Sequence, residues 1–270
     1  MALWTLIGLA KGNATTDWPR AGGDDGQAGA LGMPRVHAEK CTPACRACAD
    51  VCPTRAITIG NRQAIPRIAL DYGRCIACQL CVETCPADGA FEASGDWAFG
   101  VSERDDLRLA DDVAALPAAQ VLRATVERTF KGSLHIRHVD AGSCNGCESE
   151  LQALNNPFYN LHRLGIFFTA SPRFADLLLV TGPVTHAMRE PLRATWEAMP
   201  EPRMVMAAGT CAVSGGVAEG GYACGHGLDG VLPVDLWLPG CPPNPAAIID
   251  GLLILLGRAE QHVRGGRLHE

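Results

Sequence analysis

The sequence predicts an α/β protein of two units, a compact cysteine-rich unit followed by a larger doubly wound parallel sheet. Three observations predict this. A run of cysteines is duplicated within residues 41–86. After residue 133, apolar strand-like segments alternate with helical segments, as in sheets that are covered on both faces. A glycine-rich stretch precedes the first unit and a charged stretch separates the two, so the units are distinct along the chain.

The composition excludes several classes of protein. The chain has 270 residues and 47% are hydrophobic, so it can bury a substantial core without disulfide bonds. The net charge of −6 does not support a nucleic-acid partner. No apolar run reaches the roughly 18 residues that span a bilayer, so no transmembrane segment is expected. The 13 cysteines, an odd number, argue for reduced, metal-binding thiols in the cytoplasm.

Residues 1–36 are predicted to form an N-terminal arm or docking segment. Met1 to Ala10 is apolar but lacks the basic region of a secretory signal. This segment is expected either to form a short docking helix through Leu3, Trp4 and Ile7 or to fray against its own domain. Residues 12–36 are rich in glycine and are expected to be extended.

Residues 37–95 are predicted to form the first compact unit, because they contain an internal repeat. The segment Cys45-Arg-Ala-Cys48-Ala-Asp-Val-Cys52-Pro53 matches Cys78-Gln-Leu-Cys81-Val-Glu-Thr-Cys85-Pro86 position by position. Cys41 and Cys75 precede the two halves. Four thiolates, three from one tight loop and one from elsewhere, are the ligands of a 4Fe–4S cluster. Segments 56–59 and 64–70 predict a short hairpin between the halves.

Residues 41–86 closely resemble two-cluster 4Fe–4S ferredoxins, in which the fourth cysteine of each run binds the other cluster. The resemblance implies a ferredoxin-like α+β domain with two clusters. One cluster would take Cys41, Cys45, Cys48 and Cys85. The other would take Cys52, Cys75, Cys78 and Cys81. The first run departs from the family pattern, because three residues separate Cys41 from Cys45, and this leaves its geometry open. A pair of zinc knuckles is the alternative, and it does not account for the duplicated run with both prolines.

Residues 96–132 are predicted to connect the two units. Their charged stretch, residues 103–112, is expected to form a solvated face, and residues 118–128 are expected to form a helix.

Residues 133–270 are predicted to form a flavodoxin-like doubly wound sheet of parallel strands. The expected strands are 134–139, 166–169, 177–181, 204–207 and 234–238. Several of them are continuous apolar runs, which indicates a sheet buried on both faces. The last helix is the best marked element, with Asn244 as its N-cap, Pro245 at its first position and apolar residues from Ile248 to Leu256 on one face.

Four further cysteines follow the carboxyl ends of these predicted strands. Cys144 and Cys147 follow the first strand, Cys211 the fourth and Cys241 the fifth. Open α/β sheets bind ligands at this edge, so these cysteines predict a third 4Fe–4S cluster. Cys224 is left over and is expected to be a buried or incidental thiol.

Residues 133–258 resemble the small subunit of nickel–iron hydrogenases and the related cluster-bearing subunit of respiratory complex I. The matching segments are 144–148, 175–184, 209–216 and 239–245. In that family four such cysteines hold the proximal 4Fe–4S cluster, beside the active site of a separate large subunit. Two residues separate Cys144 from Cys147, which is similar to the hydrogenase branch, because complex I-type subunits carry two adjacent cysteines at this position.

The small-subunit module is short and has no extra cluster cysteines of its own, which is similar to the energy-converting, membrane-bound hydrogenases such as formate hydrogenlyase. The N-terminal half resembles the ferredoxin-type subunit of the same complexes, which is normally a separate polypeptide. The resemblance therefore implies a fused electron-transfer subunit with three 4Fe–4S clusters and no catalytic residue of its own. It would exchange electrons with the nickel–iron site of a partner large subunit for proton reduction or hydrogen oxidation.

The same resemblance implies membrane-arm and electron-donor subunits as further partners, and a place on the cytoplasmic face of the inner membrane. Two alternatives remain open. The chain could be the fused iron–sulfur subunit of a complex I-like quinone or ferredoxin oxidoreductase whose large subunit has lost nickel. It could also be an electron carrier or cluster-assembly scaffold, although a carrier would need only residues 37–95.

Overall fold

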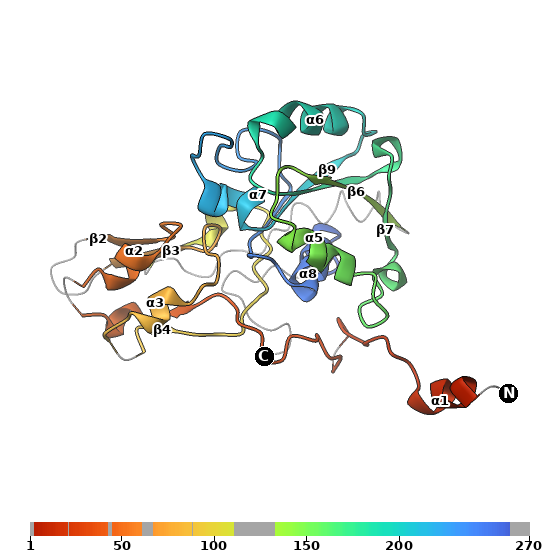
Figure 1. The fold of residues 1–270 in the computed structure, drawn as a ribbon, viewed down its shortest axis with the longest axis horizontal. Helices are drawn as coiled ribbons and strands as arrows, with labels where there is room; N and C mark the ends of the chain where they lie inside the picture. The colour runs from red at the N-terminus through yellow and green to blue at the C-terminus, as the bar shows by residue number, and fades with distance from the viewer. Residues whose placement is uncertain are drawn as a thin grey trace.

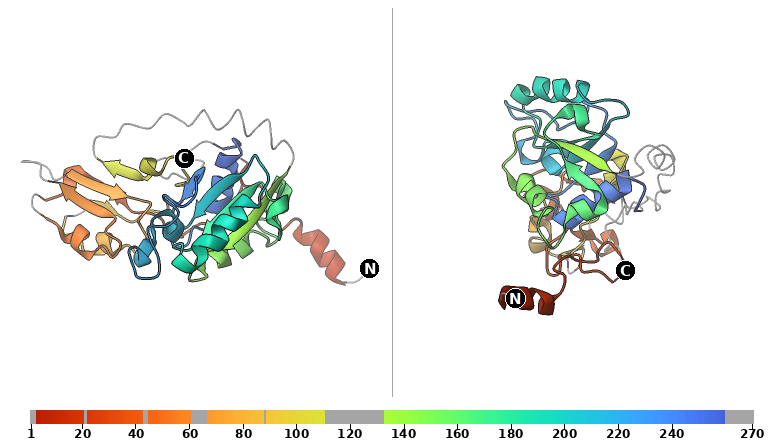
Figure 2. Two further views of the ribbon diagram at one scale, coloured as in Figure 1. Left: turned by 90° about the horizontal axis from the view of Figure 1, so that it is seen from above. Right: turned by 90° about the vertical axis from the view of Figure 1, so that its right-hand side faces the viewer.

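The computed structural model describes residues 3–20, 22–42, 45–60, 67–87, 89–110 and 133–259. A small cysteine-rich unit lies beside a larger α/β unit, and the N-terminal helix projects away from both (Figure 1). Figure 2 shows the same arrangement from two further sides.

The larger unit is built on a five-stranded sheet in which every pair of neighbours is parallel. Its strands are β6 (Leu134–Asp140), β7 (Ile166–Phe168), β8 (Leu177–Thr181), β9 (Met204–Ala208) and β10 (Leu236–Leu238). Their order across the sheet is β10-β9-β8-β6-β7. With β6 as the first strand, this is the flavodoxin-like order, which confirms the predicted fold class.

Helices cover both faces of this sheet, with α6 on one side and α5 and α8 on the other (Figure 1). The helices are α5 (Gly146–Ala153), α6 (His186–Glu197), α7 (Thr210–Ser214) and α8 (Pro245–Leu255). Every residue of β8 is buried, and its side chains alternate between two cores. Leu178 and Val180 belong to one core, while Leu177 and Leu179 belong to the other. A continuous apolar run is therefore required at this strand.

Helix α8 begins as predicted. The Asn244 side chain accepts a hydrogen bond from the amide of Ala247 at 2.7 Å, and Pro245 occupies the first turn. The expectation of a single apolar face was too narrow, because every residue of α8 except Ile254 is buried. A helix that is apolar all round is one that lies inside the molecule.

The smaller unit contains an antiparallel sheet of three strands, β2 (Ile57–Gly60), β3 (Arg67–Asp71) and β5 (Arg108–Ala110), and two short helices, α2 (Ala47–Val51) and α3 (Leu80–Glu83). A second pair of strands is formed by β1 (Arg35–Val36) and β4 (Phe91–Glu92). The two strands of the predicted hairpin pair in the register Ile57↔Leu70. The residues that join them lie outside the described residues.

Five 3-10 helices complete the described elements. They are η1 (Ala38–Lys40), η2 (Arg104–Leu107), η3 (Leu161–Leu164), η4 (Pro172–Phe174) and η5 (Gly216–Ala218).

The charged stretch after residue 102 is only partly the solvated face that was expected. The Asp105 side chain is 82% exposed, but Leu107 is fully buried and Arg104 donates two hydrogen bonds, each of 2.9 Å, to the carboxylate of Asp71. The stretch then continues as β5 in the sheet of the small unit. The expectation was therefore wrong at Arg104 and Leu107. The predicted helix at 118–128 lies outside the described residues.

The segment at Val101, which precedes this charged stretch, also joins the two units. Val101 and Trp237 exchange backbone hydrogen bonds of 3.0 and 2.7 Å along the outer edge of β10. This pairing satisfies backbone groups that an edge strand would otherwise leave open.

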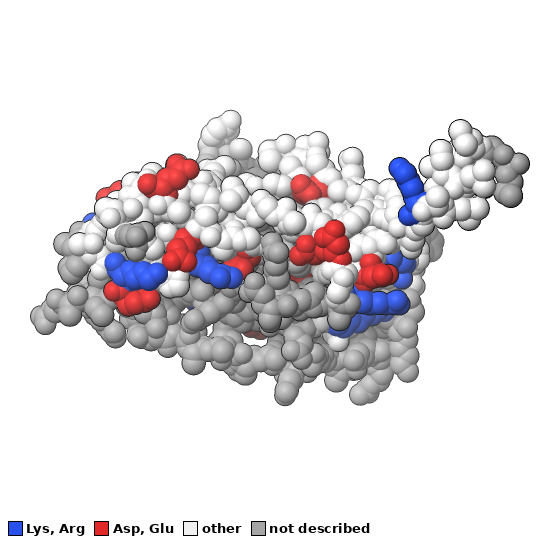
Figure 3. All heavy atoms as spheres, turned by 90° about the horizontal axis from the view of Figure 1, so that it is seen from below, with Lys and Arg blue, Asp and Glu red and all other residues white. Residues whose placement is uncertain are grey.

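The N-terminal segment is partly packed and partly exposed. Helix α1 (Leu3–Lys11) has no buried residue, and Figure 3 shows it projecting as a largely uncharged surface. After it, Trp18 is 1% exposed and meets Trp97 edge to face at 5.9 Å. Further along, the carbonyl of Pro34 accepts a hydrogen bond of 2.9 Å from the hydroxyl of Tyr72. The extended arm is thus part of the packed body. No helix among the described residues is both long and apolar enough to cross a membrane.

Candidate iron–sulfur sites

The first group of thiols surrounds the amino end of α2. Burial and the neighbouring thiol of Cys41 raise the pKa of Cys48 to about 11, and Cys45 and Cys85 contribute to the same shift. Three of these residues come from the first cysteine run, while Cys85 follows α3 in the second run. The fold therefore brings Cys85 to the first run, which is the grouping that the ferredoxin resemblance implied.

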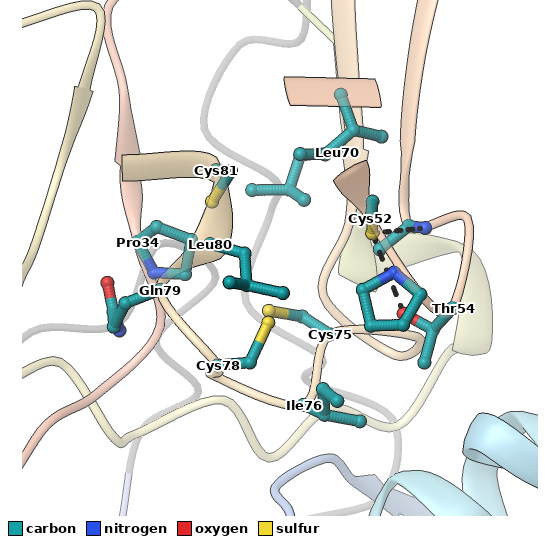
Figure 4. Close-up of a pocket in the computed structure, with 13 residues that line it drawn as sticks. Pro34, Cys52, Thr54, Leu70, Cys75, Ile76, Cys78, Gln79, Leu80 and Cys81 are labelled. Carbon is teal, nitrogen blue, oxygen red and sulfur yellow. Dashed lines mark hydrogen bonds between the residues drawn. The ribbon is translucent and has the colours of Figure 1, made fainter. Parts of the chain in front are cut away.

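The second group lines one pocket, shown in Figure 4. Its thiols are those of Cys52, Cys75, Cys78 and Cys81. Here Cys52 is the member that comes from the other run. Apolar groups close the pocket around the sulfur atoms, including the side chains of Pro34, Ile57, Leu70 and Leu80.

Burial dominates the electrostatics of this pocket. It raises the pKa of Cys75 and of Cys81 to about 12, and the neighbouring thiols add to both shifts. Without a bound metal, these groups would hold their protons at neutral pH. Iron must therefore displace protons as it binds, and the positive charge of the iron would compensate the buried thiolates.

The backbone of the second group supports the sulfur atoms. The amide of Ala56 donates to the Cys52 sulfur at 3.3 Å, and the amide of Ala77 donates to the Cys75 sulfur at 3.4 Å. Ala77 and Gln79 have φ values of 54° and 62°, which L-residues rarely adopt. Such strain is typical of loops that are held around a ligand. Amide donors to sulfur are also a main control on the reduction potential of a cluster.

The third group lies where the sequence placed it, at the carboxyl edge of the parallel sheet. Cys144 and Cys147 follow β6, Cys211 lies in α7 after β9, and Cys241 follows β10. Burial raises the pKa of Cys211 to about 11, and Cys241 and Cys144 are the next causes. Burial also raises the pKa of Cys147 and of Cys241. Cys144 and Cys241 are exposed, so this group borders the surface.

Glycine leaves the room that the third group needs. Gly209 has a φ of 94°, and a Cβ atom on it would lie 2.6 Å from the Cys147 sulfur. Gly216 has a φ of 57°, and its Cβ atom would lie 3.0 Å from the Cys211 sulfur. Both positions require glycine for conformation and for space. The open cradle and the four soft thiol donors fit a 4Fe–4S cluster.

A buried carboxylate lies next to this group. Glu148 is 8% exposed and follows Cys147 in the first turn of α5. It accepts hydrogen bonds from the hydroxyl groups of Ser143, at 2.7 Å, and of Thr181. The His138 ring lies 2.9 Å from the Thr181 hydroxyl, and burial lowers the pKa of His138. Sequence reasoning missed both partners; Thr181 is 33 residues away and reaches Glu148 through the pairing of β8 with β6.

The second and third groups lie side by side across the contact between the units. The thiol of Cys78 is among the causes that raise the pKa of Cys241, after burial and Cys144. The two thiols are therefore near neighbours, although they come from different units. The assignment of the twelve cysteines to three ligand sets stays a prediction.

Cys224 is not among the proposed ligands, although its thiol is, after burial, one of the causes that raise the pKa of Cys211. It is 5% exposed, and its thiol donates to the carbonyl of Ala218 at 2.9 Å.

Known proteins resemble both units. Residues 144–255 match the family described as NADH ubiquinone oxidoreductase, 20 Kd subunit, and residues 40–89 match the 4Fe-4S dicluster domain. Formate hydrogenlyase subunit 7 of Escherichia coli is 43% identical over 55% of this chain, which spans 60% of that protein. An uncharacterized protein of Methanocaldococcus jannaschii is 46% identical over 48% of this chain and 86% of its own length. A probable membrane-bound hydrogenase subunit, mbhJ of Pyrococcus furiosus, is 41% identical over 47% of this chain and 77% of its own.

Proposed function

Because the chain belongs to the family of the NADH ubiquinone oxidoreductase 20 Kd subunit and also carries a 4Fe-4S dicluster domain, we propose that it is the electron-transfer subunit of a nickel–iron hydrogenase complex. It is a hydrogenase-related oxidoreductase subunit, and its relatives include subunits of formate hydrogenlyase and of a probable membrane-bound hydrogenase. The hydrogen chemistry would take place on a partner large subunit.

The three cysteine groups would each hold one 4Fe–4S cluster. Cys41, Cys45, Cys48 and Cys85 would hold the first. Cys52, Cys75, Cys78 and Cys81 would hold the second, and Cys144, Cys147, Cys211 and Cys241 the third. The clusters, when bound, supply one-electron redox chemistry. The chain would hold them in place and adjust the potential of the second through amide donors such as those of Ala56 and Ala77.

The observation that carries this proposal is the contact between the second and third groups. The hydroxyl of Thr210, next to Cys211, donates to the carbonyl of Cys75 at 2.9 Å across the two units. After burial, the Cys78 thiol is among the causes that raise the pKa of Cys241. The first and second groups are linked in turn, because each takes one cysteine from the run of the other. With a cluster in each group, the fused chain would line up three redox sites, which neither unit could do alone.

The exposed side of the third group is the proposed contact with the large subunit. Cys144 and Cys241 are exposed at the carboxyl edge of the sheet, while Cys147 and Cys211 are partly buried behind them. A partner that covers this edge would bring its nickel–iron site beside the third cluster. The exposed helix α1 would serve as a further docking segment, through Leu3, Trp4 and Leu9. Membrane-arm and electron-donor subunits would place the complex on the cytoplasmic face of the inner membrane.

The test is to purify the complex anaerobically from its native host through a tag on this chain. Iron, nickel and hydrogen-dependent reduction of a viologen dye are then measured on the same sample. Stoichiometric nickel together with dye reduction is expected. Full iron loading without nickel or hydrogen activity would contradict the hydrogenase assignment, and it would favour the complex I-like oxidoreductase.

A further inference from the structure

Thr210 is a buried residue that joins the second and third cysteine groups. It is the first residue of α7 and has no exposed surface. Its hydroxyl donates to the backbone carbonyl of Cys75 at 2.9 Å and accepts a hydrogen bond from the amide of Gly240 at 3.1 Å. The amide of Thr210 in turn donates to the carbonyl of Gly240 at 2.8 Å. The hydroxyl of Thr210 therefore bonds across the contact between the two units, and the bonds to Gly240 fix it within the α/β unit.

Each partner of this side chain lies at a proposed cluster ligand. Thr210 directly precedes Cys211, and Gly240 directly precedes Cys241. Cys75 is itself a proposed ligand of the second cluster. One hydroxyl group thus ties together two loops of the third site and one loop of the second. The hydroxyl has a single proton, and the carbonyl of Cys75 takes it, so the direction of the hydrogen bond is determined.

We propose that Thr210 is a positioning residue that sets the separation between the second and third clusters, and through it the rate of electron transfer between them. This inference rests on the proposed function, because it needs both clusters. Electron tunnelling slows steeply as the distance between redox centres grows. A contact that holds both ligand loops therefore acts on the distance across the gap between the two units.

The ion pair between Arg74 and Glu219 also crosses this contact, but it acts differently. Arg74 keeps 29% of its side chain exposed, and its partner Glu219 follows η5 and is not next to a proposed ligand of the third site. The pair can hold the two units together while the ligand loops shift slightly. Thr210 is fully buried and bonds directly to the backbone of a proposed ligand, so small displacements at this point change the cluster separation.

The test compares Thr210→Val with Thr210→Ser in the complete complex. Valine keeps the shape of the side chain but removes the hydrogen-bonding hydroxyl, and serine keeps the hydroxyl. Thr195→Val is the matched control, because Thr195 also donates to a backbone carbonyl, that of Pro191 at 2.8 Å, on the exposed surface of α6. The measurements are iron content, the magnetic interaction between the reduced clusters by electron paramagnetic resonance, and the rate at which the third cluster is reduced after rapid mixing with a low-potential reductant.

Thr210→Val is expected to keep its iron, to show a weaker magnetic interaction and to reduce the third cluster several-fold more slowly. Thr210→Ser and Thr195→Val should both match the parent protein. The inference is overturned if Thr210→Val loads its clusters and matches the parent protein in the magnetic interaction and in the rate of reduction of the third cluster. It is also overturned if Thr210→Ser fails to restore both quantities. If Thr210→Val does not load iron, Thr210→Ala is measured in its place, because alanine removes the hydroxyl without adding bulk. Failure of both to load iron would show a purely structural role and would also overturn the inference.

The failure of this inference can be told apart from the failure of the proposed function. A parent protein without three reducible clusters would contradict the proposed function itself. A parent protein with three clusters, together with an unaffected Thr210→Val variant, would contradict the positioning role alone.

Discussion

Arg74 and Glu219 form a two-point ion pair across the contact between the cysteine-rich unit and the α/β unit. One guanidinium nitrogen of Arg74 lies 2.7 Å from a carboxylate oxygen of Glu219, and a second nitrogen meets the other oxygen. The ring of His226 lies 2.9 Å from the same carboxylate, whose side chain is only 13% exposed. Two parallel hydrogen bonds between a guanidinium and a carboxylate are stronger than neutral hydrogen bonds, and they fix the relative orientation of the two groups. The pair therefore acts as a clamp between the units.

Removing the charge of Glu219 should loosen this clamp. Glu219→Gln removes the two-point partner of Arg74 in a partly buried contact and leaves it with the more distant Asp71 carboxylate, at 3.7 Å, so the expected loss is about 1–3 kcal/mol in the free energy of unfolding. Anaerobic urea unfolding measures it. Glu190→Gln is the matched control, because Glu190 is 81% exposed and lies 3.6 Å from Arg193. The control should lose no more than about 0.5 kcal/mol. Equal losses in the two variants would contradict the clamp.

Gly209 is expected to be required for the third cluster alone. In Gly209→Ala the new methyl group would meet the Cys147 sulfur at 2.6 Å, in a backbone conformation that alanine disfavours. Iron should fall by one cluster, about one third of the total, while the two clusters of the ferredoxin-like unit remain. Iron analysis and electron paramagnetic resonance measure both effects.

Gly230→Ala separates crowding at the thiol from backbone strain. Gly230 has a φ of 68°, but nothing lies within 4 Å of its Cβ position. This variant should keep all its iron. If it loses as much iron as Gly209→Ala, then the cradle around Cys147 is not the cause.

Each cysteine run is proposed to give its fourth cysteine to the cluster of the other run. Comparing the cluster signals lost in pairs of variants tests this. Cys52→Ser should remove the same cluster signal as Cys78→Ser, while Cys85→Ser should remove the same signal as Cys45→Ser. The reason is that the fold groups Cys52 with the second run and Cys85 with the first. Signals are compared by electron paramagnetic resonance during a redox titration.

Cys224→Ala provides the control for these cysteine variants. Its thiol donates to the carbonyl of Ala218 and is not a proposed ligand, although it lies near enough to Cys211 to add to the effect of burial in raising the pKa of that thiol. The variant should keep its iron. If Cys52→Ser and Cys45→Ser instead removed the same signal, the exchange between runs would be wrong.

The sequence predicted the parts of these sites that depend on local spacing. The cysteine runs lie in short loops, and the ligand edge of the sheet follows from parallel strands alone, so both could be located without coordinates. The doubly wound parallel sheet was also within reach, because continuous apolar strands alternate with helices, but the order of its strands was not predicted. The N-cap of α8 at Asn244 was readable because capping depends on neighbouring residues.

The contacts between the units could not be predicted in this way. Thr210 and Cys75 are 135 residues apart, and Arg74 and Glu219 are 145 apart. Neither pair has a local signal, because each depends on how the two units dock. Strand β5 was missed because it has only three residues, too few for an alternating pattern. The packing of Trp18 was missed because glycine-rich sequence says nothing about a tertiary partner.

Asp250 makes the last prediction, which concerns pH. It lies in α8 with 1% of its surface exposed, and neither carboxylate oxygen has a hydrogen-bond partner within the described part of the chain. Burial raises the pKa of this carboxyl from 3.8 to about 7. The folded protein therefore keeps a proton that the unfolded chain releases. Its contribution to stability is complete below the unfolded pKa and is lost as the pH rises through the folded pKa.

Asp250→Asn should remove this dependence, because the amide stays neutral. The free energy of unfolding of Asp250→Asn, relative to that of the parent protein, should rise by about 2 kcal/mol between about pH 5.5 and about pH 8. Urea midpoints at the two pH values measure it. Asp229→Asn is the matched control, since Asp229 is exposed, and its effect should stay within about 0.5 kcal/mol at both pH values. An Asp250→Asn advantage that does not change with pH would mean that the buried carboxyl is ionised throughout this range, and that α8 tolerates its charge.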